Sequence, residues 1–238
     1  KFTFKGEKFM DIDVSIPRTC LPQIGAMAPD FEAITTFGNI KLSNFREKWV
    51  VLFSHPGDFT PVCTTEFIAF ARYFPYFVER NAQLIGLSVD SNASHLAWVY
   101  NIYCNTGIEI PFPVIDDRSL KVSNLYGMIS PATSETATVR SVYIIDPQGI
   151  LRTILYYPLT IGRNIPEILR ILDALQMSDA EKVATPADWM PGMPVIIPAP
   201  TTYEGLKQRI SNQDGYSCMD WYLCYKEINN KIEDGGQS

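Results

Sequence analysis

Five cysteines and two histidines are the side chains of this sequence best suited to redox or metal chemistry. The cysteines are Cys20, Cys63, Cys104, Cys218 and Cys224, and the histidines are His55 and His95. No two cysteines have CxxC spacing, so a structural zinc site would have to assemble from scattered ligands. An odd number of cysteines in a chain of 238 residues also argues against a secreted disulfide framework. The pattern favours reactive-thiol chemistry over metal binding.

Cys63 occupies the position best suited to an attacking sulfur. It follows a loop with the sequence HPGDFTPV and stands at the start of a predicted helix over residues 64–80. The free N–H groups and partial positive charge of a helix N-terminus favour a thiolate over a thiol. Thr60 can offer its hydroxyl to the sulfur or to a substrate bound beside it. Position alone equally suits a small buried hydrophobe, which many free cysteines are.

The elements around Cys63 alternate between strand and helix patterns. Short apolar runs over 49–55 and 82–90 are typical of buried strands, and 141–157 predicts a hairpin with a Pro-Gln-Gly turn. Helical spacing or start signals predict further helices over 92–104, 119–126 and 166–176. This order predicts an α/β domain with a central mixed sheet flanked by helices.

The amino-acid composition of the chain changes after residue 178. Residues 184–200 contain five prolines and predict irregular, extended chain, whereas TYEGLKQRI is compatible with a short helix. The stretch 214–227 is rich in aromatic residues and holds two cysteines. Such a tail cannot bury its apolar groups alone, so we expect it to pack on the first domain or on another subunit. We predict an N-terminal extension, a main domain and a C-terminal arm, at 1–21, 22–178 and 179–238.

Composition excludes several classes of partner. The net charge is −6 and no run of Lys or Arg stands out, which argues against nucleic acid. No apolar run approaches the roughly 18 residues of a membrane span. The N-terminus carries charges throughout and lacks the apolar region of a secretory signal, so we expect a cytoplasmic protein.

The run SHPGDFTPVCTTE resembles the active-site signature of the peroxiredoxins, in particular the one-cysteine, peroxiredoxin 6-like branch with its archaeal-type enzymes. The resemblance extends over residues 22–227. It implies a thioredoxin-like fold with a C-terminal extension and no cofactor or metal. It also implies a thiol-specific peroxidase, in which Cys63 reduces hydrogen peroxide and organic hydroperoxides and becomes a sulfenic acid.

The same resemblance assigns roles to residues around Cys63. Arg140, at the start of a predicted strand, matches the catalytic arginine that stabilises the thiolate and binds the peroxide. Thr60 and loop N–H groups would hold the peroxide in line with the sulfur, and Pro56 would shield the thiolate from water. Arg163 matches a second arginine near the substrate pocket, although a surface arginine would fit the sequence too.

Two further residues near Cys63 could support the site or could have a purely structural role. Glu66 lies one turn into the helix, where the family uses a glutamate to orient the arginines, but a solvated helix charge would also fit. His55 is either a hydrogen-bonded spacer or the group of this stretch that titrates near physiological pH. Cys20 and Cys104 are interpreted as structural or incidental.

Cys218 and Cys224 lie six residues apart in the tail. On one α-helix their Cα atoms would be separated by about 9 Å of rise, beyond the roughly 7 Å limit for a disulfide. A bond between them therefore requires a turn. The resemblance to archaeal-type enzymes implies that Cys224 resolves the sulfenic acid of a neighbouring subunit and that Cys218 is its exchange partner. Alternatively, both cysteines are packing residues among the aromatic side chains.

The resemblance further implies the partners of the protein. These are a hydroperoxide substrate, a thioredoxin- or glutaredoxin-like reductant, and a second copy in an arm-exchanged homodimer that assembles into a ring, expected to be a decamer. Two other functions share the fold. A thiol–disulfide oxidoreductase would require CxxC at the helix start, where Cys63 stands alone, and a holdase chaperone remains compatible with the sequence.

Overall fold

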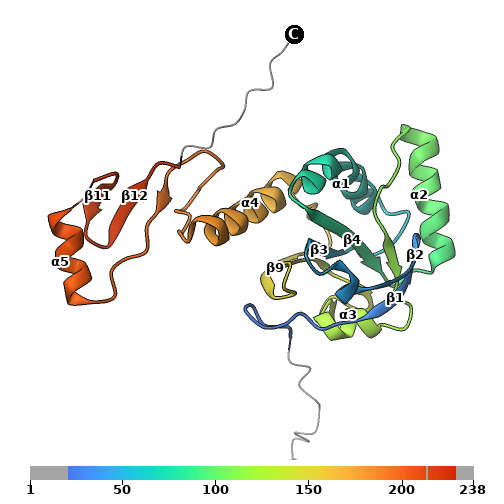
Figure 1. The fold of residues 1–238 in the computed structure, drawn as a ribbon. Coiled ribbons are helices and arrows are strands. Elements are labelled where there is room, and N and C mark those ends of the chain that lie inside the picture. The colour runs from blue at the N-terminus through green and yellow to red at the C-terminus, as the bar shows by residue number, and fades with distance from the viewer. Residues whose placement is uncertain (1–20, 213, 229–238) are drawn as a thin grey trace, which may run out of the picture.

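The computed structural model describes residues 21–212 and 214–228, and its centre is a seven-stranded mixed sheet (Figure 1). The strand order is β2-β1-β5-β4-β3-β8-β9. The sheet contains β1 (Glu32–Thr35), β2 (Gly38–Lys41), β3 (Trp49–Ser54), β4 (Ala82–Ser88), β5 (Val114–Asp116), β8 (Arg140–Ile145) and β9 (Leu151–Tyr157). The helices are η1 (Leu42–Phe45), α1 (Pro61–Glu79), α2 (Asn92–Thr106), α3 (Lys121–Tyr126), α4 (Ile165–Glu181) and α5 (Tyr203–Ser211).

The strand β3 forms the middle of this sheet because its sequence, WVVLFS, is apolar almost throughout. All six residues are buried. The strand pairs in parallel with β4 and antiparallel with β8, so both of its edges are hydrogen-bonded. Continuous apolar runs are expected for strands that are covered on both faces. The predicted central mixed sheet and the predicted β8–β9 hairpin are confirmed.

Alternate residues of β3 pack into two separate hydrophobic cores, one on each face of the sheet. Val51 and Phe53 belong to the core under α1, α2 and α4, whereas Val50 and Leu52 face the core under α3 and η1. This separation follows from the two-residue period of a strand. Cys63 belongs to the first of these cores, so the sheet face under α1 is the one that positions the reactive thiol.

Helix α1 begins three residues earlier than its predicted start at residue 64. Thr60 is the N-cap residue, and Pro61 occupies the first helical position, where a missing N–H has no cost. Cys63 is therefore the third residue of the helix and lies within its first turn. The sequence interpretation of Cys63 as a residue at a helix start is confirmed.

The C-terminal arm follows α4 and extends away from the sheet (Figure 1). It contains α5 and a small sheet of β10 (Val195–Ile196), β11 (Ser217–Asp220) and β12 (Leu223–Lys226), in the order β10-β12-β11. Val183, Trp189 and Val195 form its own small core against the end of α4. The helix over TYEGLKQRI was predicted, and the three arm strands were not. The predicted domain limit at residue 178 falls inside α4.

Two further short strands, β6 (Ile129–Ser130) and β7 (Ser134–Thr138), pair with each other beside the main sheet. No helix in the described part of the chain is both long enough and apolar enough to cross a bilayer.

Candidate active site

The thiol of Cys63 is fully buried beside an arginine. The Nη1 atom of Arg140 donates a hydrogen bond to the Sγ of Cys63 at 3.3 Å, and Arg140 is itself only 3% exposed. Arg140 is the first residue of β8, and its Nε donates to the carbonyl of Leu159, which fixes the guanidinium plane. A permanent positive charge at this distance stabilises a thiolate. The structure thus places both predicted residues together.

Glu66 joins the two arginines of the site. It lies one turn after Cys63 in α1, is 2% exposed, and accepts a 2.7 Å hydrogen bond from Nη1 of Arg140 and another of 2.7 Å from Nη2 of Arg163. Burial acts to raise the pKa of Glu66, but the charges and hydrogen bonds of Arg163 and then Arg140 outweigh it and lower the pKa. The predicted orienting position is occupied, and the solvated-charge alternative is wrong.

Arg163 supports Glu66 and has no described contact with the sulfur. Its backbone N–H and Nε both donate to Oε1 of Glu66 at 2.8 Å. Its Nη1 donates to the carbonyls of Ser54 and Ser141, at 2.9 and 3.0 Å. These contacts hold Arg163 against Glu66 and against the backbone of β3 and β8. The surface-arginine alternative is wrong, and the predicted contact of Arg163 with substrate remains a prediction.

The loop before Cys63 uses the Thr60 hydroxyl differently from the prediction. Oγ1 of Thr60 donates to the carbonyl of Gly57 at 2.9 Å, so its proton is already engaged and only its lone pairs can serve a hydroperoxide. The carbonyl of Thr60 accepts from Oγ1 of Thr64, whose oxygen in turn accepts from Nε1 of Trp98 at 3.2 Å. Pro56 is half-buried in the same loop, and its shielding role remains a prediction.

A second buried polar group lies beside this loop and was not predicted. Asp58 accepts from Nε2 of His55 at 3.0 Å and from Nδ1 of His95 at 2.8 Å. The polar atoms of these three residues lie within 4.8 Å of one another, so they form a compact buried cluster. Burial lowers the pKa of His55, against the opposing effect of Asp58, so the predicted titration near physiological pH is not supported.

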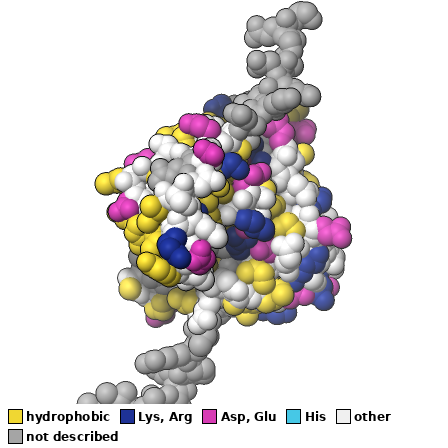
Figure 2. Space-filling model, turned by 60° about the vertical axis from the view of Figure 1, so that its left-hand side comes forward, with side chains coloured by type: hydrophobic (Ala, Val, Ile, Leu, Met, Phe, Trp, Pro, Cys, Tyr) yellow, Lys and Arg dark blue, Asp and Glu magenta, His cyan; other side chains and the backbone are white. Residues whose placement is uncertain are grey.

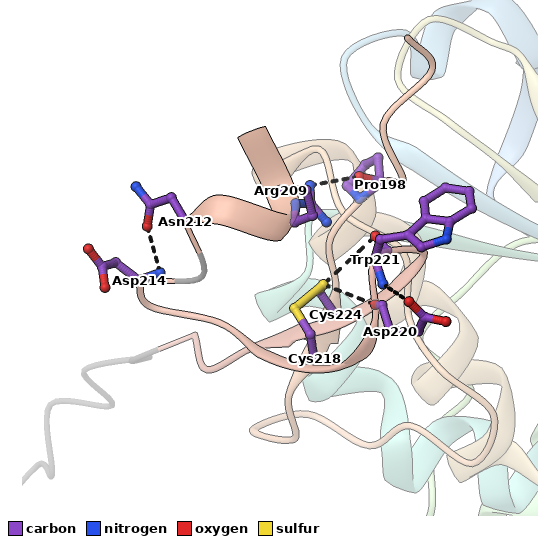
Figure 3. The surroundings of a disulfide bond; sticks show 8 residues. All are labelled: Pro198, Arg209, Asn212, Asp214, Cys218, Asp220, Trp221 and Cys224. Carbon is purple, nitrogen blue, oxygen red and sulfur yellow. Dashed lines mark hydrogen bonds between the residues drawn. A yellow bond between two sulfur atoms is a disulfide. The ribbon is translucent and has the colours of Figure 1, made fainter. Parts of the chain in front are cut away.

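The two tail cysteines form a disulfide within the arm (Figure 3). Cys218 and Cys224 face each other across the β11–β12 hairpin, with their Cα atoms 4.0 Å apart. The turn that the spacing required is the turn of this hairpin. Cys224 is fully buried and its Sγ approaches the carbonyl of Asp220 at 3.5 Å. Cys104 is exposed and unbonded, and Cys20 lies outside the described residues.

The sequence matches two family descriptions. Residues 24–154 match the AhpC/TSA family, and residues 174–212 match the C-terminal domain of one-cysteine peroxiredoxins. Peroxiredoxin 2 of Caldanaerobacter subterraneus is 69% identical over 90% of this chain and 97% of its own length. The peroxiredoxin of Methanosarcina mazei, an archaeal-type relative, is 50% identical over 89% of this chain and all of its own length.

Solved structures agree with this assignment. A yeast mitochondrial one-cysteine peroxiredoxin is 39% identical, covers 87% of this chain and 100% of its own, and superposes with a TM-score of 0.76. Peroxiredoxin 6 of Arenicola marina is 37% identical over 86% of this chain and 97% of its own, also with a TM-score of 0.76. The fold is therefore thioredoxin-like, and the chain belongs to the peroxiredoxin family and is a peroxidase.

Proposed function

We propose that this peroxidase reduces hydrogen peroxide and organic hydroperoxides through a sulfenic acid on Cys63, which Cys224 then resolves. The observation that carries the first part is the 3.3 Å contact between Arg140 and the sulfur in the first turn of α1. The arm disulfide supports the second part.

In the first step the Cys63 thiolate attacks one oxygen of the hydroperoxide. The O–O bond breaks, an S–O bond forms, and the leaving oxygen takes a proton to become water or an alcohol. The sulfur is oxidised by two electrons and the peroxide is reduced by two. Arg140 stabilises the negative charge as it moves from sulfur to the leaving oxygen.

In the second step the Cys224 thiol attacks the sulfenic sulfur, which releases water and joins Cys63 to Cys224. The Cys218 thiol then attacks Cys224, which restores the Cys63 thiol and leaves the Cys218–Cys224 disulfide. The pairing of Cys218 with Cys224, with Cys63 unpaired, is consistent with the last state of this proposed sequence. A dithiol protein of the thioredoxin or glutaredoxin class would reduce the arm.

The position of the arm favours resolution between two subunits. In one chain the arm lies beyond the end of α4, away from the start of α1 (Figure 1). The arm also exposes large apolar side chains, among them Met219 at 80% and Tyr203 at 75%. With the arm turned forward, apolar areas interrupt the charged surface (Figure 2). A homodimer with exchanged arms would cover them, and we propose its further assembly into a decameric ring and a cytoplasmic location.

The test is turnover with hydrogen peroxide and a dithiol reductant. We expect Cys63→Ser to abolish it, and Cys224→Ser to stop it after one oxidation of Cys63, without a Cys63-linked dimer on a non-reducing gel. Cys104→Ser is the matched control and should behave as the parent chain. Full turnover of Cys224→Ser would reject the resolving role, whereas equal rates for Cys63→Ser would reject the proposed peroxidase step.

A further inference from the structure

The buried group formed by His55, Asp58 and His95 has no part in the steps proposed above. Their side chains are 0%, 1% and 0% exposed. The three residues come from the end of β3, the loop before Cys63 and helix α2. Their hydrogen bonds determine where their protons are.

Both ring nitrogens of His95 lie within hydrogen-bond distance of oxygen atoms. Its Nε2 lies 3.0 Å from the carbonyl oxygen of Ile115, which can only accept a hydrogen bond. Its Nδ1 lies 2.8 and 3.0 Å from the two carboxyl oxygens of Asp58. Although burial acts to raise the pKa of Asp58, hydrogen bonds from His55 and His95 lower it, so the carboxyl is ionised. Both ring nitrogens of His95 therefore face acceptor oxygens, and each is placed to donate a hydrogen bond.

His55 must be neutral, with its proton on Nε2. That nitrogen lies 3.0 Å from the Asp58 carboxylate, which requires a donor. The Nδ1 of His55 is buried and has no hydrogen-bond partner among the described residues. A proton there would be stranded without an acceptor, which costs more free energy than leaving a bare lone pair on a neutral ring. The lowered pKa of His55, caused first by burial, agrees with this tautomer.

This imidazole lies in the layer that holds the reactive thiol. Phe53 of β3 pairs with Val142 of β8, and alternation along the two strands puts His55 and Arg140 on the same sheet face as that pair. The His55 ring contacts Phe67, one turn after Cys63, with ring centroids 4.7 Å apart. The His55 ring also lies close enough to Arg163, the second arginine of the site, for its positive charge to lower the pKa of His55.

Asp58 also anchors the loop that leads to Cys63. Its backbone N–H donates to Oδ2 of Asp90 at 2.9 Å, and Oγ of Ser88 donates to the same oxygen at 2.8 Å. The next residue, Phe59, has a φ of +56° and is 56% exposed. This left-handed conformation is unfavourable for a residue with a Cβ atom, so neighbouring contacts must hold it. Asp58 supplies them from inside the protein.

We propose that Asp58 and His95 are positioning residues for the oxidation of Cys63. They hold His55 neutral with a bare Nδ1 in the active-site layer, and they fix the loop that sets the start of α1. The inference rests on the proposed attack of Cys63 on hydroperoxide. Asp58 and His95 contact neither the sulfur nor the substrate. They act through His55, whose tautomer changes when either residue is lost.

The first test is direct, because the chain contains two histidines in all. Selective ¹⁵N labelling of histidine gives two imidazole systems in an NMR spectrum of the reduced full-length protein at pH 7. We expect one ring with two protonated nitrogens, His95, and one with a proton on Nε2 alone, His55. Assignment uses His95→Asn. A neutral His95, or a His55 protonated on Nδ1, would overturn the proposal whatever the activity.

The second test asks whether the tautomer of His55 affects the rate at which Cys63 is oxidised. We expect Asp58→Asn to remove the second proton from His95, to mix the tautomers of His55, and to lower the second-order rate of Cys63 oxidation about tenfold or more. In His95→Asn the amide keeps a donor for Asp58 without the charge, and an intermediate loss is expected. Asp116→Asn, at the same end of α2, is the control. Circular dichroism verifies folding.

Two results would contradict the proposal. One is an unchanged oxidation rate in folded Asp58→Asn and His95→Asn. The other is one equivalent of tightly bound zinc in the purified protein, with an unprotonated His95 Nδ1, since the three residues would then be metal ligands. Failure of the peroxidase step itself is seen separately, in the Cys63→Ser comparison.

Discussion

The Nη1 atom of Arg140 lies 3.3 Å from the Sγ of Cys63, and both side chains are buried. Replacement by lysine keeps a positive charge but loses the planar fork and the Nε bond to Leu159. We expect Arg140→Lys to lower the second-order rate of Cys63 oxidation about a hundredfold, as is typical when a preorganised donor is removed. Stopped-flow mixing with hydrogen peroxide measures it. Arg152→Lys, on an ion pair with Asp179, is the control, and a loss below threefold in Arg140→Lys would contradict the assignment.

Glu66 is the shared partner of two buried arginines, so its charge should matter for stability. Glu66→Gln removes the carboxylate that two buried guanidinium groups share and should lower the free energy of unfolding by about 3 kcal/mol. Glu167→Gln breaks an exposed pair with Arg170 and should cost at most about 0.5 kcal/mol. Urea unfolding of both variants compares them. Equal losses of stability in the two variants would show that burial does not increase the contribution of the Glu66 ion pairs to the free energy of unfolding.

Removal of Cys218 should trap the intermediate that it is proposed to release. In Cys218→Ser, Cys224 can still attack the sulfenic acid, but no thiol follows to free it. We expect one equivalent of peroxide to produce a covalent dimer that a thiol reductant converts back to monomers. A peptide map of the dimer should show Cys63 joined to Cys224. A dimer joined through Cys104 instead would argue against the arm as the resolving element.

The lowered pKa of His55 predicts a specific loss of stability in mild acid. Below about pH 6.5 the unfolded chain binds a proton on this residue, whereas the folded chain keeps it neutral. Stability therefore rises with pH in this window and is lost as the pH falls. Between pH 7 and 5.5 we expect the parent chain to lose about 1 kcal/mol more than His55→Gln. Chemical unfolding at both pH values measures the difference, and an equal loss would show that His55 is protonated in the folded state.

The central sheet and the place of Cys63 followed from local signals. The apolar run of β3 and the proline-rich loop before α1 each carry their information within a few neighbouring residues. Helix α1 starts at Pro61, before its predicted start, because proline suits a first helical position. The outer strands β1, β2 and β5 were not predicted, because each is only three or four residues long. Where neighbouring residues determine the structure, the sequence was sufficient.

The polar contacts of the site depended on residues far apart in the chain. Asp58 and His95 are 37 residues apart, and Arg163 and Glu66 are 97 apart. Such pairs have no periodicity, so the pattern of residues alone could not reveal them. Only the family resemblance anticipated that Glu66 orients the arginines, as its bonds to Arg163 show. The closest signal for the buried histidine group was the short His55–Asp58 spacing. The arm strands were missed because they are two to four residues long and follow a proline-rich stretch.

The charges around Cys63 balance only while the sulfur is a thiolate. Arg140 and Arg163 then oppose Glu66 and the sulfur, two positive charges against two negative ones. A sulfenic acid is neutral, so oxidation leaves this buried cluster with one positive charge in excess, which a dry interior disfavours. The folded first turn of α1 consequently holds the reduced sulfur more firmly than the oxidised one. On the proposed route, in which the arm resolves Cys63, this excess charge would favour movement of the oxidised sulfur out of its buried site toward Cys224.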